Sequence, residues 1–327
     1  MDLDTVIKDN LEVLRIYKTL IEEGMPKETP GLICDIVREA KTSEKESFCA
    51  LLSVLCGFDS EESEHDKRIE REYFSHIEKL SPDKYKNDPY YKNISFPRVN
   101  GGRWSFGRES YAPYEPFVWR DIVLTRDFRE IPQIGFFAEP FSFPAVYEDG
   151  REWMAIKPNE IETMRAPLEA VSGDVLTYGL GLGYFAYMAS RKESVKSVTV
   201  VERDGELIEL FKSHILPQFE FADKIEIVRA DAFEFAEKEI SRRHFDSVFA
   251  DLWHDAADGF DMYIRLKRLE NKNAGTKYLY WIEDTLLSQL RVMVYEALKS
   301  KGKSERDILP FLEPSYLRGL ARDIKKS

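Results

Sequence analysis

The segment Gly173–Ala186 reads GDVLTYGLGLGYFA and indicates the fold more directly than any other stretch of the chain. An apolar strand pattern runs into three glycines at alternate positions and then into a helical pattern. Glycine adopts positive φ and lets the backbone approach a ligand, and the helix that follows offers unpaired N–H groups to an anionic group. The segment therefore predicts a strand, turn and helix that bind a nucleotide-type cofactor.

The spacing of the glycines separates two kinds of cofactor site. A dinucleotide site needs Gly-x-Gly-x-x-Gly/Ala, and its third small residue would fall on Tyr184. The observed Gly-x-Gly-x-Gly, entered by Asp-Val-Leu, resembles motif I of the class I S-adenosylmethionine (SAM) dependent methyltransferases. The resemblance implies an α/β fold with a doubly wound, mostly parallel Rossmann-like sheet, and SAM as the cofactor.

Further parts of a cofactor site follow in order. The strand pattern Ser197–Val201 ends at Glu202, about 20 residues past the glycines, where a carboxylate can accept both ribose hydroxyls. A third strand, residues 224–229, is followed by Asp231 and Ala232. In the family that this resembles, such an Asp accepts from the adenine amino group, and a neighbouring backbone N–H meets a ring nitrogen. The predicted cofactor-binding residues are Gly179, Gly181, Gly183, Glu202, Asp231 and Ala232.

Ordinary structural roles remain open for the same residues. Glycines occur at tight turns of any parallel sheet, and Glu202 can be a strand-end acid. Asp231 can be the N-cap of a helix. A domain that keeps the fold and has lost its chemistry also stays open, and side chains that block the space near Gly181 would favour it.

The fourth strand pattern ends at Asp251, and the segment after it has two resemblances. Residues 251–258 read DLWHDAAD. In spermidine synthases the same place reads close to Asp-Ser-Ser-Asp-Pro, followed by Gly-Pro-Ala, and the carboxylates hold and deprotonate an amine. This chain keeps acids there but lacks the serines, the proline and Gly-Pro-Ala, so aminopropyl transfer is the alternative to methyl transfer.

The second resemblance is to catechol-type O-methyltransferases, whose fourth strand ends in Asp-x-Trp-Lys-Asp. Residues 251–255, DLWHD, match with His254 at the position of the general base. After the fifth strand pattern come Glu283 and Asp284, which correspond to metal ligands in that family. The resemblance implies Asp251 and His254 as catalytic residues, and Mg²⁺ held by Asp251, Glu283 and Asp284. The plainer alternatives are a surface His254 and an Asp284 that caps the next helix.

Methyl transfer from a sulfonium is an in-line displacement, so positioning supplies much of the acceleration and one base suffices for a hydroxyl acceptor. The sequence thus predicts a SAM-dependent methyltransferase that acts on a small molecule or a protein side chain. An aminopropyltransferase of the spermidine-synthase type is the first alternative. A non-catalytic SAM-binding or scaffolding protein is the second.

Three segments differ in pattern. Residues 1–82 predict a helical module, with helices that end at Gly24, begin at Thr29, run from Ser43 to Gly57, and continue through Ile69 to Ser81. Residues 83–157 are rich in proline and aromatic residues and predict a β-rich flap, with a hairpin turn at Glu148–Arg151. Residues 158–327 form the predicted SAM-binding domain, in which only helical patterns follow Ile282. The helical module either packs against a second subunit, which would make a homodimer, or covers the neighbouring domain.

Two short motifs in the first segments are read as structural. Asn87–Tyr91 reads NDPYY and invites comparison with the Asp/Asn-Pro-Pro-Tyr motif of amino-methyltransferases, but it has one proline and precedes the glycine turn, so it predicts a turn. The three cysteines, Cys34, Cys49 and Cys56, lie among apolar residues and predict buried thiols on helices. Together with His65 and His76 they match no common zinc pattern, and no metal ligand is assigned to them.

Charge and hydropathy limit the partners. The net charge of −12 argues against a nucleic-acid partner, because phosphate binding needs a basic face. No apolar run is long enough for a membrane span, and the N-terminus lacks the pattern of a signal peptide. The sequence predicts a cytoplasmic protein.

Overall fold

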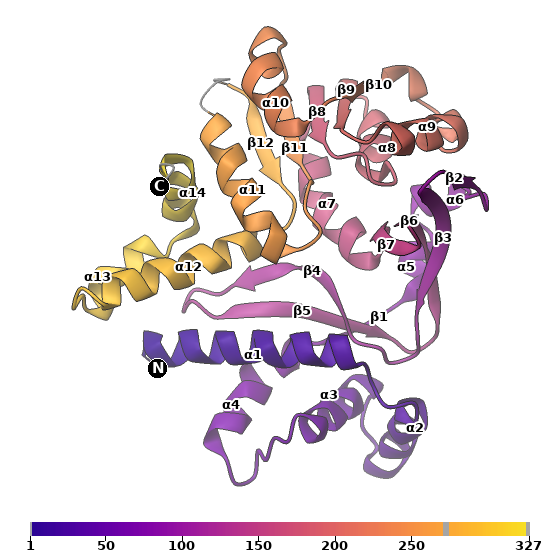
Figure 1. Cartoon of the computed structure of the whole chain (residues 1–327). Coiled ribbons are helices and arrows are strands. Elements are labelled where there is room, and N and C mark those ends of the chain that lie inside the picture. The colour runs from indigo at the N-terminus through magenta and orange to yellow at the C-terminus, as the bar shows by residue number, and fades with distance from the viewer. Residues whose placement is uncertain (1, 271–274, 325–327) are drawn as a thin grey trace. The chain divides into compact units, whose positions relative to one another are not determined.

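The glycine segment and the strand patterns after it form a sheet of five parallel strands, as expected from the sequence (Figure 1). The computed structural model describes residues 2–270 and 275–324, with backbone only at residues 100 and 101. The strands are β8 (Gly173–Tyr178), β9 (Val195–Glu202), β10 (Ile225–Arg229), β11 (Ser247–Ala250) and β12 (Lys277–Tyr280). They lie in the order β10-β9-β8-β11-β12 and all pairs are parallel. The predicted parallel sheet is confirmed.

Helical connections join these strands. They comprise α8 (Tyr184–Ser190), α9 (Gly205–His214), the short helices η2 (Leu216–Gln218) and η3 (Ala222–Lys224), α10 (Ala232–Glu234), the π-helix η4 (Phe235–Glu239), η5 (Ile240–Arg242), and α11 (Ala256–Leu269). Crossovers between parallel strands are right-handed. Since the chain moves outward from β8 in one direction and then returns to its other side, the early and late connections lie on opposite faces. This reversal leaves a crevice at the carboxyl ends of β8 and β11, where open α/β sheets bind ligands.

The chain divides into two units, and this sheet belongs to the second. Unit 1 comprises Met1–Tyr85 and Ser110–Ser142, and unit 2 comprises Lys86–Glu109 and Phe143–Ser327. Unit 2 also contains α6 (Pro89–Asn93), α7 (Pro158–Ala170), α12 (Glu283–Lys299), α13 (Glu305–Ile308), η7 (Leu309–Phe311) and α14 (Pro314–Asp323). Among the described residues after β12 there is no strand, which agrees with the helical pattern of the sequence.

A second sheet, mostly in unit 2, precedes the parallel one. Its order is β2 (Asn100–Gly101), β3 (Trp104–Tyr111), β6 (Phe141–Glu148) and β7 (Arg151–Ala155). The hairpin predicted between β6 and β7 is confirmed: Asp149 and Gly150 both have positive φ, 49° and 78°, as a type I′ turn requires. This hairpin brings residues of β7 to the crevice at the carboxyl ends of β8 and β11.

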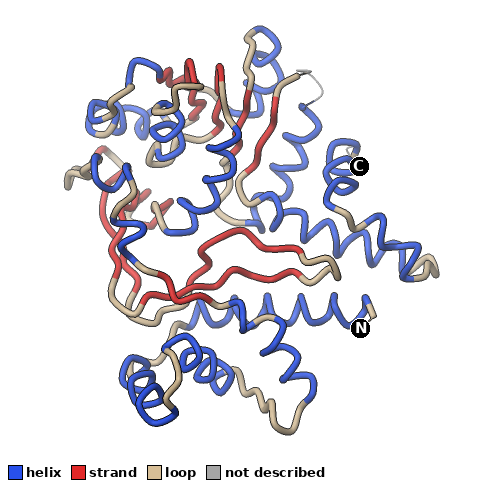
Figure 2. The backbone as a smooth tube through the Cα atoms, turned by 180° about the vertical axis from the view of Figure 1, so that it is seen from behind, coloured by secondary structure: helices blue, strands red, loops and turns tan. Residues whose placement is uncertain are grey.

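Unit 1 contains helices and a three-stranded sheet. Figure 2 shows the helices of the chain in blue and its strands in red. The helices are α1 (Leu3–Glu23), α2 (Thr29–Ala40), α3 (Glu44–Leu55), α4 (Glu64–Glu72), η1 (Phe74–His76) and α5 (Pro82–Lys86), which crosses the boundary between the units. The sheet order is β1 (Glu78–Leu80), β5 (Glu130–Phe137) and β4 (Phe117–Leu124). The fourth helix was expected to reach Ser81, but it ends at Glu72, because Glu78–Leu80 pairs in parallel with β5 and takes strand geometry.

The expected flap of residues 83–157 contributes to both units. Its hairpin β4–β5 belongs to unit 1, where Phe136 stacks on Phe48 of α3 with ring centroids 4.1 Å apart. Asn10 of α1 is buried, donates to the Phe128 carbonyl (2.9 Å) and accepts from the Glu130 backbone N–H (3.0 Å). The three-segment division at residues 82 and 157 therefore differs from that of the structure, because aromatic packing and these hydrogen bonds join the hairpin to the helices.

The cysteines are less uniformly buried than expected. Cys34 is exposed on α2, whereas Cys49 and Cys56 are partly buried. Burial raises the pKa of both the Cys49 and Cys56 thiols to about 11, which keeps them protonated and unreactive at neutral pH. The prediction of buried thiols is wrong for Cys34. No described helix is both long enough and apolar enough to cross a membrane.

Candidate cofactor and active site

The glycine turn between β8 and α8 has the geometry that its sequence predicts. The backbone angle φ is 95° at Gly179, 49° at Gly181 and 76° at Gly183. Residues with a Cβ rarely adopt such positive values. A Cβ on Gly179 would lie 2.0 Å from the backbone carbonyl oxygen of Asp251. The turn therefore packs directly against the end of β11, and glycine is required there on two grounds.

Helix α6 supports this turn. The Tyr90 hydroxyl donates to the Leu182 carbonyl, and the Tyr184 hydroxyl donates to Asp88 Oδ2 (3.0 Å). Asp88 also accepts from the Tyr90 backbone N–H (2.8 Å), so it is the N-cap of α6. The NDPYY motif, expected to be only a turn, thus starts a helix that contacts the glycine turn through two side-chain hydrogen bonds.

Glu202 lies beside the glycine turn at the end of β9. Its Oε2 accepts from the Leu180 backbone N–H (3.2 Å), and its Oε1 accepts from the Asp204 backbone N–H (2.8 Å). Burial raises the pKa of the Glu202 carboxyl. Glu202, the residue predicted to bind the ribose, is therefore oriented by a backbone N–H of the glycine turn.

Asp231 and Ala232 follow β10 and line a cavity together with Glu202 and the glycine turn. Asp231 Oδ1 accepts from the backbone N–H groups of Phe233 (2.9 Å) and Glu234 (3.0 Å) and so caps α10. The N-cap alternative therefore holds for this residue. It is compatible with the predicted role, since Asp231 is exposed and lines the cavity.

Asp251 follows β11 and shares the cavity with a carboxylate that the sequence did not reveal. Its backbone N–H donates to the Tyr178 carbonyl (3.0 Å), and burial raises the pKa of its carboxyl to about 7. Glu160, in the first turn of α7, faces the same cavity, and burial and the charge of Asp251 raise its pKa well above the ordinary value. In the sequence, Pro158 followed by Glu160 is typical of an ordinary helix start, because acids favour the first turn. No local signal separates Glu160 from such an acid.

His254 also lines the cavity, but its imidazole is exposed. Its ring centroid lies 6.4 Å from that of Trp153, and its backbone N–H donates to the Asp258 carboxylate (3.1 Å). Asp255 accepts from the N–H groups of Ala257 (2.6 Å) and Asp258 (3.3 Å) and caps α11. The second acid of the DLWHD segment is therefore a helix cap.

Glu283 and Asp284, expected to hold Mg²⁺ with Asp251, are engaged elsewhere. Glu283 accepts from the Tyr263 hydroxyl (2.9 Å) and from Arg318 Nε (3.2 Å), and Asp284 pairs with Arg318 (3.5 Å). Neither residue lines the cavity, and among the described residues the three acids do not form a group with metal-ligand spacing. The proposed Mg²⁺ set is not brought together, because α12 begins directly at these acids and α14 supplies Arg318 to neutralise them.

The cavity has a volume of about 780 Å³ and a predominantly acidic wall. Its acidic residues are Glu148, Glu152, Glu160, Glu202, Asp204, Asp231, Asp251 and Asp258. Its basic residues are Arg103, Lys157 and Arg203, in addition to His254. Arg103 pairs with Asp204, and Lys157 pairs with Glu152 (2.6 Å). These pairs engage two of the cations, and the remaining acids outnumber the remaining basic residues on the wall. Such a wall favours a cationic ligand.

Met154 of β7 covers part of the glycine turn. Its Sδ accepts from the Leu182 backbone N–H (3.2 Å), and a Cβ on Gly181 would lie 2.5 Å from that sulfur. Gly179 and Gly181 nevertheless line the cavity. The space beside the turn is thus narrowed by one thioether and not filled.

No protein-family model and no curated protein matches this chain. Among solved structures it is similar to a spermidine synthase in complex with the transition state analogue AdoDATO, at 20% identity and a TM-score of 0.33 over 41% of this chain and 47% of that chain. It is also similar to a spermidine synthase from Thermotoga maritima, at 18% identity and a TM-score of 0.33 over 44% of this chain and 52% of that chain. The chain thus matches about half the length of these proteins. Similarity of this extent does not assign the chain to a family.

Proposed function

We propose that the chain is a SAM-dependent methyltransferase whose acceptor is a small molecule or a protein side chain. The observation that carries the proposal is the position of Glu202. Its carboxylate ends β9, accepts from the Leu180 N–H of the glycine turn, and shares a cavity with Asp231 and Asp251. Acids at three successive strand ends beside a glycine turn suit a cationic nucleoside better than a dinucleotide, whose negatively charged phosphates the acids would repel.

The residues present fit SAM. A cavity of about 780 Å³ lies within the usual range of small-molecule sites, about 300–1,000 Å³. Glu202 would accept the ribose hydroxyls, and Asp231 with the Ala232 backbone would face the adenine. The acidic wall would balance the sulfonium charge. When bound, SAM supplies a methyl carbon that is open to attack by a nucleophile.

The carboxylate pair Glu160 and Asp251 supplies the base in this proposal. With a pKa near 7, Asp251 exists in both protonation states at neutral pH, as an efficient general base requires. An amine acceptor would use this pair, because carboxylates hold an ammonium group and can take its proton. For a hydroxyl acceptor, the base that we propose is His254, which also lines the cavity.

Aminopropyl transfer from decarboxylated SAM is a second candidate, favoured by the same acidic wall. Decarboxylated SAM lacks the carboxylate of SAM, and two of the three cations on this wall, Arg103 and Lys157, are already paired with acids. A ligand with more positive charge would therefore find more partners in this cavity.

Calorimetric titration of the protein with SAM, decarboxylated SAM and NAD tests both candidates. We expect saturable binding of SAM or decarboxylated SAM, and none of NAD. Glu202→Ala should weaken binding by about 1 to 3 kcal/mol, or about 5- to 150-fold, because the ribose hydroxyls lose a charged partner. Glu193→Ala, at an exposed acid outside the cavity, is the matched control and should bind like the wild type. Unchanged affinity in Glu202→Ala, or a preference for NAD, would overturn the cofactor assignment.

A further inference from the structure

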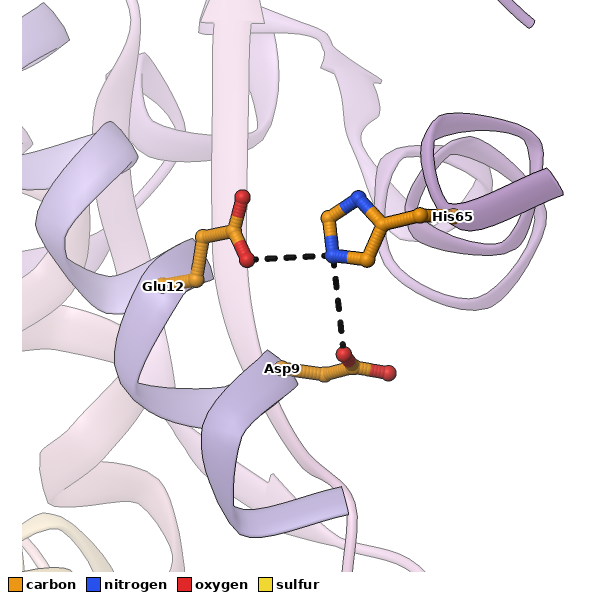
Figure 3. Close-up of side chains that lie close together, drawn as sticks. All are labelled: Asp9, Glu12 and His65. Carbon is orange, nitrogen blue, oxygen red and sulfur yellow. Dashed lines mark ion pairs between the residues drawn. The ribbon is translucent and has the colours of Figure 1, made fainter. Parts of the chain in front are cut away.

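Three side chains with metal-ligand chemistry meet between α1 and α4 in unit 1 (Figure 3). His65 Nε2 lies 3.1 Å from Glu12 Oε2 and 3.8 Å from Asp9 Oδ1, and all three ligand atoms lie within 4.8 Å of one another. Asp9 and Glu12 are three residues apart on α1 and therefore share a face. Bonds of about 2.0–2.2 Å in a tetrahedral site place neighbouring ligand atoms roughly 3.2–3.6 Å apart. The observed separations need only small side-chain adjustments to meet that geometry.

The other nitrogen of His65 has the partner typical of a metal-bound imidazole. His65 Nδ1 lies 3.0 Å from Asp66 Oδ1, and Asp66 Oδ2 accepts from the Asp59 backbone N–H (3.0 Å). A histidine that binds a metal almost always donates its second N–H to a carboxylate or carbonyl group, which fixes the tautomer and the ring orientation. Figure 3 shows Nε2 facing the carboxylates of Glu12 and Asp9, with which the structure pairs it. With the proton on Nδ1, Nε2 is free to bind a metal ion.

The charges around the cluster suit a dication. Asp9, Glu12 and Asp66 contribute three negative charges, and Arg68 contributes one positive charge through Nε and Nη2, 2.8 and 3.0 Å from the Asp9 oxygens. In its neutral form, which is the form that binds a metal, the imidazole adds no charge and the sum is −2. Each carboxylate oxygen accepts at two positions, so Asp9 Oδ1 can bind a cation while it keeps Arg68. The Asp9 side chain is only 3% exposed and pairs with Arg68. The single positive charge of Arg68 balances only one of the three carboxylates.

We infer that Asp9, Glu12 and His65 bind a divalent transition-metal ion, with Zn²⁺ as the best fit, and that the ion joins α1 to α4. One imidazole nitrogen and two carboxylate oxygens suit Zn²⁺ and its neighbours in the first transition row better than Mg²⁺ or Ca²⁺, which prefer oxygen ligands throughout. Water would complete the coordination, because Glu12 and His65 are partly exposed. The site is independent of the proposed transferase function, since its residues belong to unit 1 and the cofactor cavity belongs to unit 2.

The test is a calorimetric titration of the metal-stripped, full-length protein with ZnCl₂. The wild type should bind one Zn²⁺ at this site, and its melting temperature should rise when Zn²⁺ is added. His65→Ala and Glu12→Gln should each lower the Zn²⁺ affinity at least 10-fold and remove the rise in melting temperature. Asp66→Asn should lower the affinity about 10- to 100-fold, because it leaves all three ligands in place and removes only the partner of Nδ1.

His76→Ala is the matched control, at an exposed histidine of η1 outside the cluster. It should bind Zn²⁺ like the wild type. Circular dichroism of each variant checks that the fold is retained, and Glu12→Gln provides a near-isosteric change if His65→Ala folds poorly. The inference is overturned if the wild type binds no Zn²⁺, or if Zn²⁺ binding survives unchanged in both His65→Ala and Glu12→Gln.

Discussion

Two carboxyl groups that face one cavity cannot both ionise easily. Glu160 and Asp251 come from α7 and from the end of β11, and burial raises the pKa of each. The charge of Asp251 raises the pKa of Glu160 further. Since the two groups interact, their titration belongs to the pair, and near neutral pH the pair retains a proton. This retained proton affects both stability and chemistry.

Stability should fall as the pH rises from about 4 to about 7. Asp251 has a folded pKa of about 7, above the value of about 3.9 for an unfolded Asp, so in this window the folded state binds more protons than the unfolded state. Asp251→Asn removes the ionisation and should raise the unfolding free energy at pH 8 by at least about 1 kcal/mol relative to the wild type. Urea unfolding at pH 5 and pH 8 measures the change. Asp261→Asn, at an exposed acid of α11, is the control, and an equal pH dependence in wild type and Asp251→Asn would contradict the prediction.

The same two positions separate an amine acceptor from a hydroxyl acceptor. If the acceptor is an amine, Asp251→Asn should lower kcat by about 10²- to 10⁴-fold, the usual contribution of a general base, and His254→Ala should leave it nearly unchanged. If the acceptor is a hydroxyl, His254→Ala should lower kcat to a similar extent. The measurement is turnover of SAM with a panel of amines and alcohols. Full activity in both variants would exclude both residues from catalysis.

At the scale of elements, the glycine turn between β8 and α8 depends on a helix from an earlier part of the chain. Tyr90 of α6 is fully buried and donates to the Leu182 carbonyl, and its ring centroid lies 5.4 Å from that of Tyr184. Asp88 caps α6 and accepts from Tyr184. These contacts hold the end of the glycine turn against α6, so the conformation of the turn is determined from two sides.

Tyr90→Phe removes only one hydroxyl group, but it should lower both the stability of the glycine turn and the affinity for the cofactor. The change removes one hydroxyl and leaves the Leu182 carbonyl without that donor, which should lower the unfolding free energy by about 1 to 3 kcal/mol. Cofactor affinity should also fall, because the turn loses a restraint. Denaturant unfolding and calorimetry measure the two effects. Tyr316→Phe, on the exposed face of α14, is the control, and equal stability of the two variants would contradict the role given to Tyr90.

At the scale of the whole molecule, the two proposed sites lie in different units, and unit 1 has a core of its own. The β4–β5 hairpin contributes Phe136 to the core of unit 1, with Phe48 and Tyr73. A truncation at residue 82 would therefore leave this hairpin without the helices that bury it. The predicted boundary at residue 82 is a poor place to divide the protein.

Excision of unit 1 as a whole should leave cofactor binding intact. The variant lacks residues 1–85 and replaces residues 110–142 by a short Gly-Ser linker between the neighbouring strands β3 and β6. We expect a folded protein that binds SAM within a few-fold of the full chain, because every cavity residue belongs to unit 2. Deletion of residues 1–82 alone is the comparison and should aggregate, since it exposes the apolar face of β5. Loss of SAM binding on clean excision would show that the units depend on each other.

The sequence by itself determined the parallel sheet, its glycine turn and the acids at three strand ends. These features are local: alternate glycines, β-rich runs and strand-end acids follow one another within short segments, and the backbone chemistry of each segment is largely its own. The same locality explains the confirmed β6–β7 hairpin, since Asp149 and Gly150 specify their turn without help from the rest of the chain.

Only the tertiary structure decided which side chains share the cavity and which are neutralised elsewhere. Glu160 resembles any helix-start acid until the fold sets it opposite Asp251, and Glu283 and Asp284 resemble metal ligands until α14 brings Arg318 to them. The end of α4 at Glu72 and the transfer of β4–β5 to unit 1 depend in the same way on partners distant in sequence. The physical reason is that burial and ion pairing are properties of neighbours in space, which a local pattern does not encode.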